Sequence, residues 1–125
     1  MTEEQRLQNL CVPTGPIDVV LDTDTFNEID DQFAIAYLLR AGADIRTAAI
    51  YAAPFFNANS TSPADGMEKS YDEIHKVLSL LGTNVPVFRG STQFLSDEKT
   101  PVVSAAAEDL AARAMRYSPK HPLYV

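Results

Sequence analysis

The sequence is poor in cysteine, in basic residues and in long apolar runs, and each shortage excludes a class of protein. Cys11 is the only cysteine among 125 residues, so an internal disulfide is excluded and a reducing, cytoplasmic location is expected. Lysine and arginine number 10 against 17 aspartates and glutamates. The resulting net charge of −7 argues against nucleic acid or an anionic membrane as the main partner.

Apolar stretches are short throughout the chain, and none is long enough to be predicted to cross a bilayer. The opening residues, MTEEQRLQNL, are acidic and polar, which differs from the basic and then apolar start of a signal peptide. A hydrophobic share of 46% and a charged share of 22% are typical of a globular protein. We expect one domain over residues 17–125, preceded by a lead-in at residues 1–16 with a helical turn.

Apolar patterning predicts alternating strands and helices. Strands are predicted at Ile17–Leu21, around the continuous apolar run Val19–Leu21, and at the largely apolar Ile45–Ala52, with a helix predicted between them at Asp30–Ala41. A strand, a helix and a strand with short connections form a βαβ unit, which is almost always right-handed with parallel strands. The fold predicted is therefore α/β, a Rossmann-like open parallel sheet flanked by helices.

Later segments continue this alternation. After a polar loop come an amphipathic helix, a short strand, a second loop, an alanine-rich helix capped by Ser104, and the start of another strand. These segments are predicted, in that order, at residues 58–65, 67–81, 85–89, 92–100, 104–116 and 123–125.

The most informative feature is a cluster of acids between the first strand and the first helix. Asp22, Asp24, Asp30 and Asp31 lie within ten residues, at the carboxyl end of a buried strand, which is where open α/β sheets bind ligands. Taken singly, these residues are also typical of a turn and of a helix start. Four crowded carboxylates repel one another unless a proton or a cation holds them. A hard divalent cation with oxygen ligands meets that need.

This stretch also resembles a known family. D-T-D, followed shortly by D-D-Q-F-A-I-A, is similar to the D-x-D-P-G-x-D-D-A signature of the inosine-uridine-type nucleoside hydrolases. Residues 25–29 separate the second and third aspartates, which is two residues more than in the family's pattern, and the glycine is absent. The run N-V-P-V-F-R-G-S near residue 87 resembles the family's V-P-V-Y-x-G segment.

The resemblance implies a calcium-dependent enzyme that hydrolyses the N-glycosidic bond of ribonucleosides to base and ribose. It implies that Asp24 ligates the metal and takes a proton from the attacking water, and that Asp31 is the main chelating carboxylate. Asp30 and Asn57 correspond to residues that contact the ribose, and Asp22 to a carboxylate that supports the loop from outside the ligand shell. It also implies homo-oligomeric assembly.

Members of that family are more than twice as long as this chain. The resemblance therefore implies that residues 17–125 are the N-terminal part of such a domain and that they are inactive alone. One alternative is a haloacid-dehalogenase-type magnesium phosphatase, which also places D-x-D after a buried strand, although Phe26 stands where that family prefers threonine or valine. A second alternative is a module that binds a metal or a riboside without turnover.

Overall fold

The computed structural model describes residues 1–125 and contains one four-stranded sheet between helices. All strand pairs are parallel, and the strand order is β3-β2-β1-β4. The α/β open parallel sheet predicted from the sequence is confirmed. The elements are α1 (Glu3–Asn9), β1 (Ile17–Thr23), α2 (Asp30–Arg40), η1 (Gly42–Asp44), β2 (Ile45–Ala52), α3 (Pro63–Leu81), β3 (Val87–Arg89), α4 (Ala105–Ala114) and β4 (Leu123–Tyr124).

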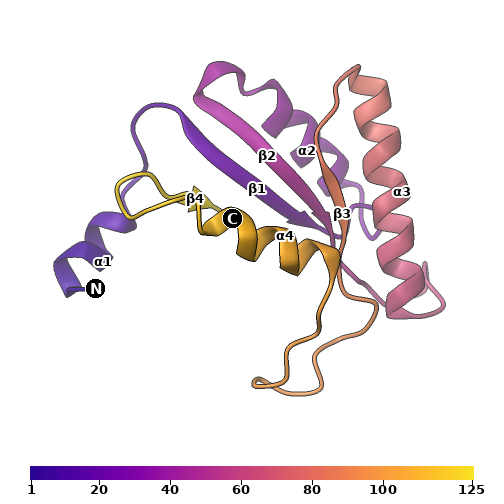
Figure 1. Cartoon of the computed structure of the whole chain (residues 1–125). Coiled ribbons are helices and arrows are strands. Elements are labelled where there is room, and N and C mark those ends of the chain that lie inside the picture. Colours follow the sequence, from indigo (N-terminus) through magenta and orange to yellow (C-terminus); the bar gives the residue numbers. More distant parts are fainter.

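Helices cover both faces of the sheet (Figure 1), and a separate core lies beneath the helices on each face. The larger core lies between the sheet and the helices α2 and α3, and it contains Ile35, Ile50, Ala52, Met67, Ile74, Val77, Leu78 and Val85. The smaller core lies on the other face of the sheet, beneath α4, and it contains Val20, Ala49, Tyr51 and Ala106. Because helices cover both faces, the middle strands are apolar on both sides, as their sequences predict.

A polar cluster also attaches α4 to the sheet. The Tyr51 hydroxyl donates a hydrogen bond of 2.7 Å to Asp109. Asp109 also accepts bonds of 2.9 and 3.0 Å from Arg113, one turn further along α4. Helix α4 is therefore held beside β2 both by apolar packing and by the hydrogen bond from Tyr51.

One residue of β2 has no partner in the neighbouring strand. Val19 of β1 pairs with Thr47, whereas Val20 pairs with Ala49, so Ala48 is an inserted residue in a β-bulge. Ala48 and Ala49 both pack toward the core beneath α4.

Two predicted boundaries are wrong for identifiable reasons. Helix α3 begins at Pro63 rather than near Met67, so the end of the predicted polar loop is helical. The Ser62 hydroxyl caps this helix by accepting from the N–H of Asp65 at 3.1 Å, and proline suits the first helical turn. Strand β3 begins at Val87 rather than Val85.

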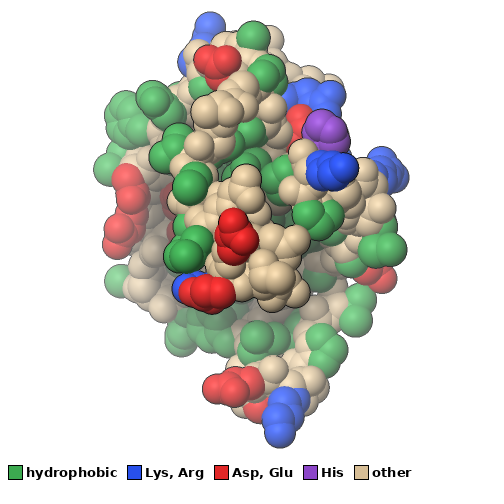
Figure 2. Space-filling model, turned by 90° about the vertical axis from the view of Figure 1, so that its left-hand side faces the viewer, with side chains coloured by type: hydrophobic (Ala, Val, Ile, Leu, Met, Phe, Trp, Pro, Cys, Tyr) green, Lys and Arg blue, Asp and Glu red, His purple; other side chains and the backbone are tan.

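Residues 91–103 form a long connection without regular structure between β3 and α4. In Figure 1 this segment, drawn in orange, extends below the body of the molecule. Figure 2 shows it from the side as a projecting lobe with acidic and basic side chains. None of the helices has both the length and the apolar character needed to span a bilayer.

Candidate functional site

The acid-rich bend, residues 22–31, lies where the strand order reverses. Strand β1 pairs with β2 on one side and with β4 on the other, and the chain reaches β4 only after building β2 and β3 outward. In open α/β sheets the crevice at the carboxyl ends of two such strands is the usual ligand site. The fold therefore brings the bend to the position that the sequence predicted for it.

Asp24 and Asp31 form the centre of the bend. Asp24 follows β1 directly, Asp31 lies in the first turn of α2, and their two carboxyl groups are within hydrogen-bonding reach of each other. Burial raises the pKa of Asp31 to about 6, and the neighbouring Asp24 carboxyl and the charge of Asp30 act in the same direction. A hydrogen bond from Thr23 opposes this rise only in part. The pair therefore favours a shared proton or a bound cation.

Asp22 lies on the opposite face of β1 from Thr23, beside an apolar cavity of about 440 Å³. Loss of hydration raises its pKa, and the charge of Asp24 adds to that effect. The cavity is enclosed by the end of β2, the 91–103 connection and the first turn of α4, including Tyr51, Pro54, Phe94, Leu95, Val102, Ala106 and Leu110. A mostly apolar pocket of this size next to carboxylates is typical of small-molecule sites.

Asn27 connects the bend to the loop after β2, and the sequence analysis gave it no role. Its side-chain amide donates to Asp24 at 2.9 Å, and its side-chain oxygen accepts from the amide of Asn57. Its backbone N–H donates to the Asp24 carbonyl at 2.7 Å, which closes a turn. Aspartate is favoured at the first position of a turn, so the sequence could have indicated the turn that Asn27 closes, although not its contact with Asn57.

Buried contacts shape the longer connection between Asp24 and Asp30. The hydroxyls of Thr23 and Thr25 lie 2.9 Å apart, and Thr25 is fully buried. The Phe26 ring stacks on Phe55 with centroids 6.4 Å apart. Thr25 and Phe26 therefore anchor the bend in the protein, so that it is not a freely solvated loop.

The five residues predicted for the site divide into an inner and an outer group. Asp24 and Asp31 lie within hydrogen-bonding reach of each other, and Asp22 is close enough for its pKa to respond to Asp24. Asp30 is exposed at the start of α2, and it influences Asp31 through its charge. Asn57 is also exposed and reaches the pair only through Asn27.

The carboxylates of the acid-rich bend are of the type that binds a hard cation, but few of them lie close together. Paired carboxylates at the end of a strand are suitable donors for Ca²⁺ or Mg²⁺. The structure contains no group of three or more His, Cys, Asp or Glu side chains arranged to hold a metal ion. Asp24 and Asp31 could provide two ligands to such a cation, and water or substrate oxygens would have to fill the other positions.

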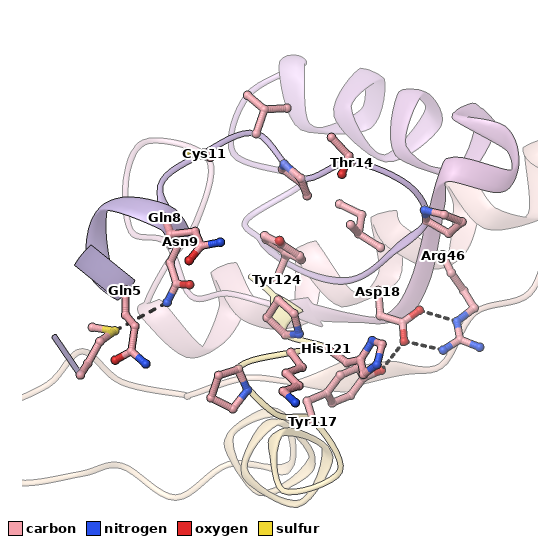
Figure 3. A pocket seen from close by; sticks show the side chains of 18 residues that line it. Gln5, Gln8, Asn9, Cys11, Thr14, Asp18, Arg46, Tyr117, His121 and Tyr124 are labelled. Atoms are coloured by element: carbon pink, nitrogen blue, oxygen red, sulfur yellow. Dashed lines mark hydrogen bonds and ion pairs between the residues drawn. The ribbon is translucent and has the colours of Figure 1, made fainter. Parts of the chain in front are cut away.

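A larger cavity, of about 1540 Å³, lies at the amino end of β1 (Figure 3). The lead-in and the segment after α4 line it, including Gln8, Tyr117 and His121. On its wall Asp18 accepts hydrogen bonds from Arg46 and from the Tyr117 hydroxyl, which hold the pKa of Asp18 below its usual range. Asp18 and Arg46 are thus paired with each other, and no carboxyl group of this cavity has a raised pKa, so the acid-rich bend is the better candidate site although the cavity is larger.

Comparison with models of protein families, with curated proteins and with solved structures found no match to this chain. The function is therefore argued from the residues of the bend and from their geometry.

Proposed function

We propose that Asp24 and Asp31 hold a divalent cation, with calcium preferred, and that the site serves hydrolysis of the N-glycosidic bond of a ribonucleoside. The observation that carries the proposal is the contact of these two carboxyls at the carboxyl end of β1. Two ionised carboxylates in contact are stabilised by a cation, and their place in the fold is that of a ligand site. The similarity to the nucleoside hydrolase signature gives the reaction.

The resemblance implies a role for each side chain, and the positions of the side chains are consistent with these roles. A bound cation supplies positive charge and makes a coordinated water more acidic. Asp24, oriented by its 2.9 Å bond from Asn27, accepts the proton of the attacking water. The carboxylates also stabilise the positive charge that develops on the sugar as the bond to the base breaks. Asp30 and Asn57, on the exposed rim, bind the ribose hydroxyls.

The cavity beside Asp22 is consistent with a ligand that has an apolar, aromatic part. Its volume of about 440 Å³ lies in the range of about 300–1,000 Å³ found for small-molecule sites. Tyr51 and Phe94 contribute aromatic surface to its lining, and a flat nucleobase is the part of a nucleoside that packs on such surface.

Binding without turnover is the second candidate, because the chain provides only two carboxylates in contact. We expect a dissociation constant for calcium of about 10⁻⁴ to 10⁻³ M, the range of weak calcium modules. Titration calorimetry with CaCl₂ should give one saturable site. Asp24→Asn and Asp31→Asn should each abolish the heat of binding, whereas Asp72→Asn, on the exposed surface of α3, should leave it unchanged. Equal binding by all three variants would contradict the assignment.

Analysis of the products distinguishes nucleoside hydrolysis from phosphate-ester hydrolysis. The chain is incubated with calcium and inosine or uridine, and separately with magnesium and a phosphate ester. Free ribose that disappears in Asp24→Asn supports the hydrolase, whereas inorganic phosphate supports the dehalogenase-type phosphatase. Saturable calcium binding with neither product shows that this chain binds calcium without turnover.

A further inference from the structure

The outer surface of α2 is an exposed apolar stripe that nothing in the chain covers. Ile29, Phe33 and Tyr37 follow one another at intervals of four residues, so they lie along one side of the helix. Their exposed fractions are 71%, 70% and 79%. Together with Arg40 in the last turn, which lies on the same side, these residues are called the α2 stripe.

The composition of α2 shows that this exposure is unusual. Seven of its eleven residues are apolar or aromatic, yet only Ile35 is buried. Its inner side packs through Ile35 and Leu39 against the larger core. A helix that is apolar all round normally has both sides covered, and here only one side is covered.

The charges along the helix are complementary to those of a second copy. Asp30 lies in the first turn and Arg40 in the last. In an antiparallel pair related by a twofold axis near residue 35, Asp30 faces Arg40 of the second copy at both ends, and Phe33 faces Tyr37. The helix dipoles then also oppose each other favourably. Arg40 is available for this contact, because its only hydrogen bond is a 3.4 Å contact to the Leu81 carbonyl.

The area available suits a weak dimer. An aromatic side chain buries roughly 150–250 Å² in all, and Phe33 and Tyr37 are 70% and 79% exposed, so these side chains in two copies can remove at most roughly 450–750 Å² from water. The two Ile29 side chains and the stems of Arg40 bring the total close to the roughly 1,200 Å² at which stable interfaces begin. Weak, transient complexes have interfaces at this low end of the size range.

We propose that the α2 stripe is the interface of a homodimer in which two α2 helices pack antiparallel. The proposal does not rest on the reaction assigned to the acid-rich bend, but Asp30 borders both sites, so the oligomeric state is measured without nucleoside. Sedimentation equilibrium from about 5 μM to about 1 mM, a range that brackets micromolar affinities, should show a reversible monomer–dimer equilibrium. Physiological salt is used, because at a Debye length of about 8 Å the repulsion between two acidic chains is largely screened.

Substitutions by an uncharged polar residue test the α2 stripe without adding charge. Phe33→Gln and Tyr37→Gln should each raise the dissociation constant by at least roughly 30-fold, the effect of removing a central aromatic contact. Val103→Gln is the matched control, since Val103 is 75% exposed but lies just before α4, and it should leave the constant unchanged. Circular dichroism confirms that each variant is folded.

A charge exchange tests the antiparallel arrangement. Arg40→Glu should weaken the dimer, and adding Asp30→Lys to the same chain should restore it, because each end then again has opposite charges. The proposal is overturned if the chain is monomeric at every concentration. It is also overturned if both glutamine variants dimerise as tightly as the wild type, or if Val103→Gln weakens the dimer equally.

Discussion

At the scale of the residue, Asp31 links the candidate site to the stability of the protein. Folding raises its pKa from 3.8 to about 6, so between these pH values the folded state binds the proton more tightly than the unfolded state. This contribution to the free energy of unfolding is full below pH 3.8, falls as the pH rises to 6 and is absent above it. The carboxylate pair is therefore a local source of instability at neutral pH unless a cation is bound.

Asp31→Asn should raise the free energy of unfolding at pH 7.5 by about 1–2 kcal/mol, a value reduced for the partial solvent exposure of the side chain. The gain should vanish near pH 4, where Asp31 is protonated in the wild type. Urea unfolding in EDTA between those pH values measures both effects. Asp72→Asn serves as the control, and a variant that is less stable than the wild type at pH 7.5 would contradict the prediction.

At the scale of the element, α3 can pack closely on the loop after β2 because Gly66 has no side chain. A Cβ built on Gly66 would lie 2.1 Å from the carbonyl oxygen of Phe55, which is backbone and cannot move aside. Glycine to alanine inside a helix normally stabilises by about 1 kcal/mol. At Gly66 the close approach to the Phe55 carbonyl makes the same substitution destabilising.

We therefore expect Gly66→Ala to destabilise the protein by about 1–3 kcal/mol, the usual cost of overpacking. Thermal and urea unfolding give the value. Ser79→Ala, at an exposed position of the same helix, should be neutral or slightly stabilising. If Gly66→Ala were as stable as the wild type, the close contact between α3 and the loop would be wrong.

The elements that the sequence predicted well are those with a strong local pattern. Strand β2 matches its predicted range of Ile45–Ala52, and Ser104 caps α4 as expected. The start of α3 was missed because the polar residues of ANSTSPAD were interpreted as loop, although a serine before a proline is a helix-start signal. Strand β3 is shorter than predicted because proline cannot donate to a ladder, and Pro86 only accepts a bond from Ile50.

The candidate site was predictable in part, because the acids are close in sequence. Asp22, Asp24 and Asp31 come from the end of one strand and the start of the next helix, so their proximity follows from local geometry. Asn27 was not predictable as the connecting residue, because its partner Asn57 lies 30 residues away. A contact of that kind depends on how two loops meet, which no local pattern records.

At the scale of the whole molecule, the lead-in contributes little to folding. Helix α1 has no buried residue, and between it and the body lies the large cavity of Figure 3. Removing residues 1–12 should change the free energy of unfolding by less than about 0.5 kcal/mol, as is usual for exposed residues. Ile35→Ala, in the larger core, should cost about 2–5 kcal/mol. Urea unfolding compares both, and a loss above about 1 kcal/mol on truncation would show that the lead-in is part of the domain.

The inserted Ala48 shifts the alternation of side chains along β2 relative to that along β1. Since neighbouring residues of a strand point to opposite faces, the extra residue changes which face each later side chain of β2 meets relative to β1. Beyond it, Tyr51 lies on the same face as Asp22, while Ile50 points to the opposite core. If β2 paired with β1 without the bulge, so that Ala48 rather than Ala49 lay opposite Val20, those two positions would be exchanged, with the Tyr51 phenol in the hydrocarbon layer and Ile50 toward the pocket. The bulge therefore decides which side chains the acid-rich end of the sheet can have as neighbours.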